Sequence, residues 1–126
     1  MIRRTRQRDA VVRALRSAGR PLSPGEILEA AQRDCPGIGL RTVYRHIREL
    51  SDAGKLVGVD YPGQPLRYEP AATAHHAHFI CRRCQRVFDI PGEIPDIPVT
   101  PPPGFRLSGQ ETVFYGTCAD CTGKQP

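Results

Sequence analysis

The chain has 126 residues and a mass of 13.9 kDa, enough for one domain of ordinary size or for two very small ones. Hydrophobic residues make up 39% of it, and no stretch approaches the roughly 18 consecutive apolar residues of a membrane span, so we exclude a transmembrane role. The formal charge of +5 comes from residues 1–70, which hold 13 basic and 8 acidic side chains, while residues 71–126 hold 5 of each. A one-sided basic charge favours a nucleic-acid partner over a merely solvated surface.

Residues 5–53 show the apolar spacing of three short helices. We expect the first helix over residues 5–18. The second has a clear start, because Ser23, Pro24 and Glu26 form the pattern of a capping box with proline at the first helical position. We expect the third over residues 40–53, with its buried face formed by Leu40, Val43, Ile47 and Leu50.

The opposite side of the third helix carries residues suited to phosphate and base contacts, namely Arg41, Thr42, Tyr44, Arg45 and Arg48. Two strands, over residues 55–61 and 66–69, follow it around a Pro/Gly turn. Three helices and a two-stranded wing predict a winged helix-turn-helix over residues 1–70, with the third helix in the major groove. We expect Arg67 of the wing to flank the DNA backbone, and we include Arg8 of the first helix among the DNA-contacting residues.

Two C-x-x-C pairs are the sharpest motif of residues 71–126. Cys81 and Cys84 are separated by 33 residues from Cys118 and Cys121, and four thiolates suit one tetrahedral ion. The basic N-terminus leads into a charged helix rather than a secretory signal, so we expect a cytoplasmic protein with reduced thiols. Structural Zn²⁺ is therefore favoured over disulfides or a rubredoxin-like iron site. The fifth cysteine, Cys35, reads as an ordinary half-buried thiol.

Three histidines lie just before the first pair, in the segment His75-His76-Ala77-His78. In a strand, His76 and His78 project to one side and His75 to the other. Glu69 and Asp89 are the carboxylates most easily brought to the pair. Nitrogen and oxygen ligands of this kind suit Mn²⁺, Fe²⁺ or Zn²⁺, so the sequence predicts a second, sulfur-free metal site, against the alternative that the histidines only pack beside the zinc site.

Together these residues resemble the ferric uptake regulator (Fur) family of metal-responsive repressors, which includes zinc, manganese and peroxide sensors. The resemblance rests on residues 5–8, Arg41-Thr42-Val43-Tyr44-Arg45, Arg67-Tyr68-Glu69, residues 75–84, and residues 115–121 with both second-pair cysteines. It implies an α+β fold, with an N-terminal winged helix-turn-helix and a small, zinc-stapled C-terminal β domain for dimerisation over residues 71–126. It also implies a regulatory metal at Glu69, His76, His78 and Asp89, and DNA contact by Tyr44 and Arg45.

The sequence departs from the family pattern at several positions. Many members have one more histidine ligand in the regulatory site, and the matching position here is about Pro21. Some members have a third metal site, which here would consist of His75, Ala77 and Gln110. Ala77 and Gln110 cannot bind the metal as their counterparts do, so we expect no third site. Six of the 13 prolines lie within residues 91–103, where the family has a dimerisation helix. Proline inside a helix costs about 3 kcal/mol or more, so we expect no helix there and a dimer based on strands over residues 85–90 and 106–116.

Three functions compete on these residues. The first is a homodimeric, metal-dependent repressor that binds double-stranded DNA at a pseudo-palindromic operator near metal homeostasis genes. The second is a DNA-binding module with structural zinc only, which responds to a redox signal at Cys35 or at the metal. The third, a metallohydrolase, is disfavoured because no nucleophile or general-base motif accompanies the metal ligands, so we expect no enzyme.

Overall fold

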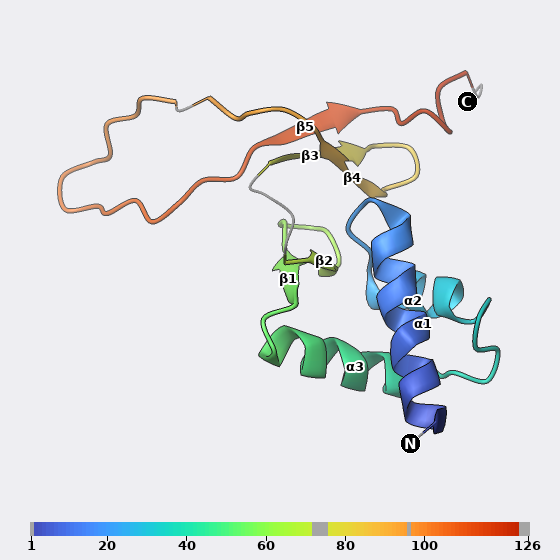
Figure 1. Ribbon diagram of the computed structural model, residues 1–126. Helices are drawn as coiled ribbons and strands as arrows, with labels where there is room; N and C mark the ends of the chain where they lie inside the picture. The colour runs from blue at the N-terminus through green and yellow to red at the C-terminus, as the bar shows by residue number, and fades with distance from the viewer. Residues whose placement is uncertain (1, 72–75, 96, 124–126) are drawn as a thin grey trace. The chain divides into compact units, whose positions relative to one another are not determined.

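The structure is a computed structural model that describes residues 2–71, 76–95 and 97–123. The chain divides into two compact units, Met1–Ala74 and His75–Pro126, and each has its own sheet (Figure 1). No helix in the described part of the chain is long and apolar enough to cross a bilayer.

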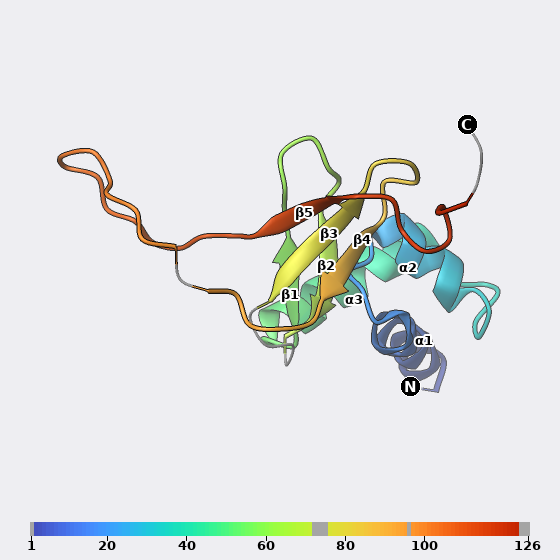
Figure 2. The same cartoon turned by 90° about the horizontal axis from the view of Figure 1, so that it is seen from above.

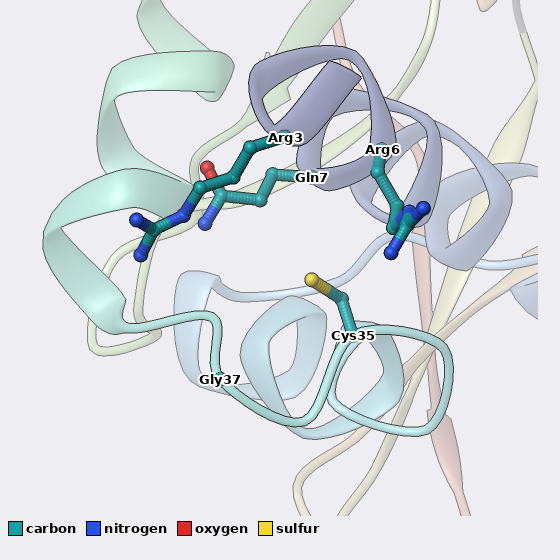
Figure 3. A pocket seen from close by; sticks show the side chains of 5 residues that line it. All are labelled: Arg3, Arg6, Gln7, Cys35 and Gly37. Atoms are coloured by element: carbon teal, nitrogen blue, oxygen red, sulfur yellow. The ribbon is translucent and has the colours of Figure 1, made fainter.

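Three helices form the first unit: α1 spans Ile2–Ala18, α2 spans Pro24–Ala31 and α3 spans Leu40–Asp52. The predicted capping box starts α2, since the Glu26 N–H donates to Ser23 Oγ at 3.2 Å and the Ser23 N–H donates to Glu26 Oε1 at 3.0 Å. The helices enclose one apolar core, made of Ala10, Val11, Ala14, Leu15, Leu22, Ile27, Ala31, Ile38, Val43, Ile47, Leu50 and Leu56. A cavity of about 350 Å³ lies beside this core, between the start of α1 and the loop after α2 (Figure 3).

The buried face of α3 differs from the predicted one at two positions. Val43, Ile47 and Leu50 are buried as expected, but Leu40 is 43% exposed at the start of the helix, where the packing surface has not yet begun. His46 is buried instead, with 1% exposure, and neither of its ring nitrogens has a hydrogen-bond partner among the residues described here. The stripe is therefore Val43, His46, Ile47 and Leu50.

His46 makes the first unit sensitive to acid. Burial lowers the pKa of His46, and the positive charges of Arg45, Arg4 and Arg8 lower it further, while Glu49 opposes them. The unfolded chain therefore takes up a proton at the ordinary imidazole pKa of about 6.5, before the folded chain does. Stability is fully present above that pH and falls as the pH drops below it.

We expect His46→Leu to reduce the acid sensitivity of the first unit. Between pH 7.5 and 5.5, calorimetry should show a smaller fall in melting temperature for the variant than for the wild type. A difference of 1 kcal/mol corresponds to about 4–8 °C in a domain of this size. Equal pH dependence in the two proteins would assign the acid sensitivity to other groups.

Two strands form the wing, β1 over Leu56–Val59 and β2 over Arg67–Pro70, paired antiparallel. A bridge extends the sheet, because Leu22, between α1 and α2, exchanges backbone hydrogen bonds of 2.9 and 2.8 Å with Tyr68. Three helices with this wing confirm the predicted winged helix-turn-helix.

The second unit contains a three-stranded sheet in the order β4-β3-β5 (Figure 2). Strand β3 spans Ala77–Cys81 and pairs antiparallel with β4, Val87–Ile90, and parallel with β5, Val113–Gly116. The predicted strand over residues 106–116 is thus correct only in its last four residues. Residues 106–112 do not form a strand. A strand needs a neighbour that pairs with its backbone groups, and the pairing of β3 with β5 begins only at Val113.

A long loop joins β4 to β5 and runs out from the sheet (Figures 1 and 2). It contains no helix in its described residues, 91–95 and 97–112, which confirms the prediction drawn from the prolines. Its apolar side chains are exposed, namely Ile97, Val99, Phe105 and Leu107, each between 58% and 65%.

Candidate metal centres and DNA-binding surface

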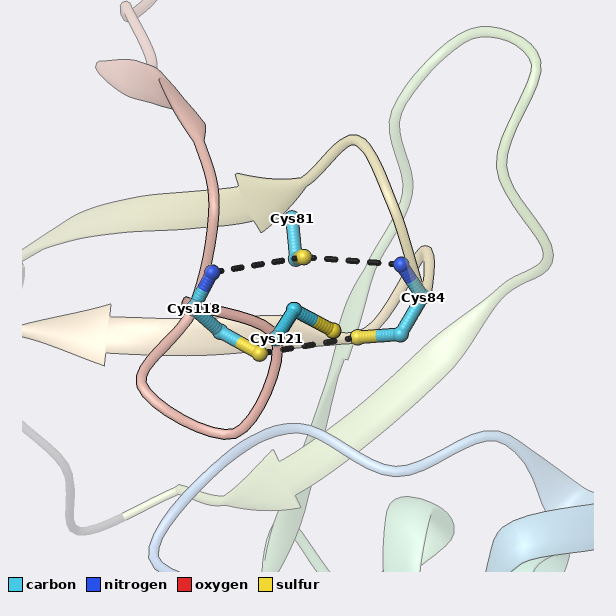
Figure 4. A group of neighbouring side chains, drawn as sticks. All are labelled: Cys81, Cys84, Cys118 and Cys121. Carbon is cyan, nitrogen blue, oxygen red and sulfur yellow. Dashed lines mark hydrogen bonds between the residues drawn. The ribbon is translucent and has the colours of Figure 1, made fainter. Parts of the chain in front are cut away.

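The four predicted cysteine ligands converge in the second unit (Figure 4). Cys81 ends β3 and Cys84 lies in the turn that follows, while Cys118 and Cys121 lie in a turn just after β5. The parallel pairing of β3 with β5 places Gly116 opposite Cys81, which brings the two pairs together. Their sulfur atoms all lie within 4.8 Å of one another.

Backbone amides and one arginine favour the thiolate form at two of these sulfurs, those of Cys81 and Cys84. Burial alone raises the pKa of Cys81, but the N–H groups of Cys84 and Cys118 donate to its sulfur at 3.4 and 3.3 Å and lower that pKa to about 6. Arg86 Nε donates to the Cys84 sulfur at 3.2 Å, which lowers the pKa of Cys84 against the opposing effect of burial. Burial and the neighbouring sulfurs raise the pKa of Cys121 to about 12. The four sulfurs therefore do not all ionise at neutral pH without a cation among them.

The geometry of the cluster fits a tetrahedral thiolate site. A tetrahedral ion with metal–sulfur bonds of about 2.3 Å needs sulfur atoms about 3.8 Å apart. The Cys84 and Cys118 sulfurs are 3.7 Å apart. The residues present thus fit a Zn²⁺-sized ion in their donor atoms and in this spacing.

Arg86 compensates the charge of the cluster. Its Nη2 lies 3.7 Å from the Cys118 sulfur and donates to Asp120 at 3.0 Å. Arg82, which follows the ligand Cys81 in sequence, lies over the Tyr115 ring at 4.3 Å. Sequence analysis missed Asp120, although its position inside the second C-x-x-C pair was the available signal.

A second cluster brings two histidines onto one carboxylate. Asp89 Oδ1 lies 2.8 Å from His76 Nε2 and 3.3 Å from His78 Nε2, and the two rings are 4.5 Å apart. His78 on β3 is directly opposite Asp89 on β4, and His76 immediately precedes β3 on the same side. Both imidazoles are nearly buried, with side-chain exposures of 11% and 12%. Two nitrogen donors and one oxygen donor thus converge without sulfur, as a hard or borderline divalent ion requires.

The sequence analysis also named Glu69 and His75 near this cluster. Glu69 belongs to the first unit, where it lies on β2 opposite Val57. His75 lies outside the described residues.

The solvent-facing side of α3 carries the predicted DNA-contacting residues. Arg41, Tyr44, Arg45 and Arg48 are exposed there, and Thr42 is half-buried. Arg8 is exposed on α1. Two ion pairs with Glu49, from Arg45 at 3.7 Å and Arg4 at 2.8 Å, hold part of this surface.

Arg67 departs from its expected role. Its side chain is only 6% exposed, donates to Gln64 Oε1 at 3.0 Å, and lies 3.7 Å from Glu26 Oε1. A guanidinium held in this way joins the wing to α2 and is not available to a DNA phosphate. The sequence did not reveal the burial of Arg67, because one buried arginine leaves no periodic signal in a four-residue strand.

The chain is similar to several known proteins. The chain is 30% identical to the transcriptional regulator FurA of Mycobacterium bovis, over 96% of this chain and 84% of FurA. It is 28% identical to the peroxide-responsive repressor PerR of Staphylococcus saprophyticus, over 98% of this chain and 84% of PerR. Its fold resembles that of the Helicobacter pylori ferric uptake regulator, which has three functional metal-binding sites, with a TM-score of 0.65, 22% identity, and coverage of 95% and 82% of the two chains.

The pattern of the ferric uptake regulator family itself matches residues 1–97, more than three quarters of the sequence. That segment includes the winged helix, the first cysteine pair and the His76, His78 and Asp89 cluster. The winged helix, the paired cysteines and this match together show that the chain belongs to the ferric uptake regulator family of metal-responsive transcriptional regulators.

Proposed function

We propose that this protein is a metal-dependent, DNA-binding transcriptional repressor of metal homeostasis genes, acting in the cytoplasm. The observation that carries the proposal is the convergence of His76, His78 and Asp89, whose three donor atoms lie within 4.8 Å of one another and include no sulfur. A separate nitrogen and oxygen site beside a thiolate site supports two roles for metal, one reversible and one structural.

We assign the reversible role to the histidine cluster, with Glu69 of β2 as the fourth ligand, as the family resemblance implies. Mn²⁺, Fe²⁺ and Zn²⁺ all accept this ligand set. Because Glu69 belongs to the first unit and the other three ligands to the second, an ion bound by all four would couple the DNA-binding unit to the second unit. Such an ion shifts the population toward the DNA-competent state only to the extent that it binds that state more tightly.

We assign the structural role to the four cysteines, with Zn²⁺ as the ion. Four soft thiolates select Zn²⁺ or iron, and the hydrogen bonds from backbone N–H groups and Arg86 offset the negative charge of a four-thiolate site. Reduced thiols in the cytoplasm are consistent with this assignment.

A metal titration tests the proposed function. The protein is loaded with Zn²⁺ at the cysteines, and Mn²⁺, Fe²⁺ or further Zn²⁺ is then added in the presence of a duplex selected from a random-sequence pool. We expect at least one ion to raise DNA affinity about 5–150-fold, the usual range of coupling between two sites. Constant affinity for all three ions would reject a metal-dependent repressor.

The α3 surface supplies the proposed DNA contacts, with Arg41, Thr42, Tyr44, Arg45 and Arg48 on one exposed side and Arg8 on α1. We expect Arg45→Ala to weaken binding roughly tenfold, or about 1.4 kcal/mol, without loss of stability, because the side chain is exposed and its ion pair is long. The logarithm of the DNA-binding constant falls linearly with the logarithm of the salt concentration, and losing one phosphate contact should make that slope less negative by about 0.9.

Arg106→Ala is the matched control for that measurement, because it removes the same charge from an exposed position on the second unit. Its affinity and salt slope should equal those of the wild type. Equal effects of the two substitutions would indicate a general charge effect and not a specific α3 contact.

A redox response is the second candidate, favoured by the similarity to PerR. Both functions share the DNA surface and the cysteine site, so they differ only in the signal. Peroxide that abolishes DNA binding of the metal-loaded protein, while metal removal does not, would favour the redox function.

We propose that two copies of the chain pair through the second unit, so that two winged helices bind a pseudo-palindromic operator. Strand β5 supports this, since β3 is its only partner among the described strands and its Phe114 and Tyr115 are 51% and 56% exposed. The exposed apolar side chains of the loop before β5 adjoin this edge in sequence. An unpaired strand edge next to apolar residues is a surface that monomers rarely keep exposed.

We expect Phe114→Arg to convert a dimer to a monomer in analytical ultracentrifugation, because a charge would enter an apolar contact. Val57→Arg, at a comparably exposed apolar position on the wing, should leave the dimer unchanged. A wild-type chain that sediments as a monomer at micromolar concentration would contradict the proposed pairing.

A further inference from the structure

The cavity beside the core of the first unit has an unusual lining. It encloses about 350 Å³, which is within the size range of small-ligand pockets, between the first two turns of α1 and the loop that follows α2. Arg3, Arg6 and Gln7 line it from α1, and Cys35 and Gly37 line it from the loop (Figure 3). No part of the proposed metal or DNA sites uses these side chains.

Gln7 occupies a position where the helix pattern calls for an apolar side chain. It continues the buried stripe of α1, three and four residues before Ala10 and Val11, and is only 8% exposed. Its amide forms no hydrogen bond with any residue that the structure describes. An amide that lines a cavity and has no partner among the described residues can form a hydrogen bond with a ligand there.

Two arginines, Arg3 and Arg6, also line this cavity. Arg3 and Arg6 are exposed, and neither forms an ion pair within the described residues, in contrast to Arg4 and Arg13, which bind Glu49 and Asp34. Guanidinium groups bind carboxylates through paired hydrogen bonds. The cavity therefore favours a ligand with carboxylate groups.

Cys35 adds a thiol to the lining of the cavity. Its sulfur is a half-buried free thiol that points from the loop toward α1 (Figure 3). The loop position is fixed, since the Cys35 N–H donates to the Ala31 carbonyl at 2.9 Å and the Cys35 carbonyl accepts from the Ile38 N–H at 3.0 Å. A thiol at a defined place beside two cations and an unpartnered amide forms a site for a covalent sulfur ligand.

We propose that Cys35 is a site of reversible mixed-disulfide formation with small, peptide-like disulfides that carry carboxylates. The carboxylates bind Arg3 and Arg6, and an amide group of the ligand binds Gln7. The site does not depend on the metal response or the DNA binding of the proposed repressor, and it specifies a chemistry for the redox signal at Cys35 that the sequence analysis considered.

The reaction balances without a further oxidant. The Cys35 thiolate attacks one sulfur of the disulfide R–S–S–R, a bond forms between Cys35 Sγ and that sulfur, and the other sulfur departs as R–S⁻. Cys35 and one ligand sulfur become the new disulfide, while the departing sulfur is reduced. The reverse reaction with a free thiol restores Cys35.

The test compares probes of opposite charge on the full-length, zinc-loaded protein. Oxidised glutathione carries carboxylates and amides, whereas cystamine is a cationic disulfide. Adduct formation is followed by mass spectrometry and assigned by peptide mapping, with an unstructured cysteine peptide as the reference for intrinsic reactivity. Relative to that peptide, we expect Cys35 to prefer oxidised glutathione over cystamine by at least roughly tenfold, as local steering of an anion predicts.

Matched variants test the lining of the cavity. Arg3→Ala/Arg6→Ala should remove the preference for oxidised glutathione, while Arg16→Ala/Arg106→Ala, which removes the same charge elsewhere, should keep it. Gln7→Glu should slow the reaction with oxidised glutathione and not that with cystamine, because it puts a negative charge at the amide position. Circular dichroism checks that each variant is folded.

Three results would overturn the proposal. The first is a Cys35 that reacts with neither probe, and the second is a Cys35 with the same preference as the reference peptide. The third is an equal loss of preference in the two double-arginine variants, which would indicate net charge and not a built site.

Discussion

Cys81→Ser is expected to abolish zinc retention and to unfold the second unit. The ligands make up half of the buried hydrophobic residues described in that unit, since Cys81, Cys118 and Cys121 are buried alongside Ala77, Ile80 and Val87. Little apolar surface is therefore available to replace the metal. Binding of structural Zn²⁺ supplies of order 10 kcal/mol in small zinc domains, comparable to the whole stability of an ordinary domain.

The measurement combines bound zinc per chain with far-ultraviolet circular dichroism and thermal unfolding. Cys35→Ser is the matched control, because Cys35 belongs to the first unit and should leave zinc content and melting temperature unchanged. A Cys81→Ser protein that keeps its native spectrum and its stability would show that the strands hold the second unit without the ion.

The predictions from sequence succeeded where a pattern repeats or where chemistry restricts the choice. The capping box at Ser23 and Glu26 was readable because few other roles require those residues at that spacing. The four cysteines were readable because two C-x-x-C pairs have few uses in a reduced compartment. Both are local signals that do not depend on how the rest of the chain packs.

The predictions failed where packing decides between equivalent choices. Leu40 and His46 both fit the periodicity of α3, and only the position of α1 and α2 determines which of them is buried. Arg67 is a residue type that commonly binds DNA phosphates, but here its side chain is buried and contacts Gln64 and Glu26 within the first unit. The start of β5 depends on where β3 begins, because Val113 pairs with His78 near the first residue of β3, and the alternating residues of β5 do not encode that position.

His76→Ala and His78→Ala are each expected to remove metal-dependent DNA binding while leaving the structural zinc and the fold in place. Each ring supplies one of three convergent donors. Its loss should therefore lower the affinity for the regulatory ion by more than the 10–100-fold that is typical when a residue hydrogen-bonded to a ligand is lost. The four sulfurs form a separate cluster, so zinc content should not change. Protons compete with metal for imidazole nitrogens, so acid should also weaken the wild-type response.

Asp89→Asn completes the series, because an amide oxygen is a weaker ligand of nearly the same shape and should reduce the metal response without affecting the packing of β4. Glu93→Gln makes the same change of chemistry at an exposed position of the same unit and is the matched control. DNA affinity of the zinc-loaded variants is measured against added Mn²⁺, Fe²⁺ or Zn²⁺ by fluorescence anisotropy. If both histidine variants and Asp89→Asn respond to metal as Glu93→Gln does, the sensing ion binds elsewhere, because removing a donor from a three-donor cluster cannot leave the affinity of that cluster unchanged.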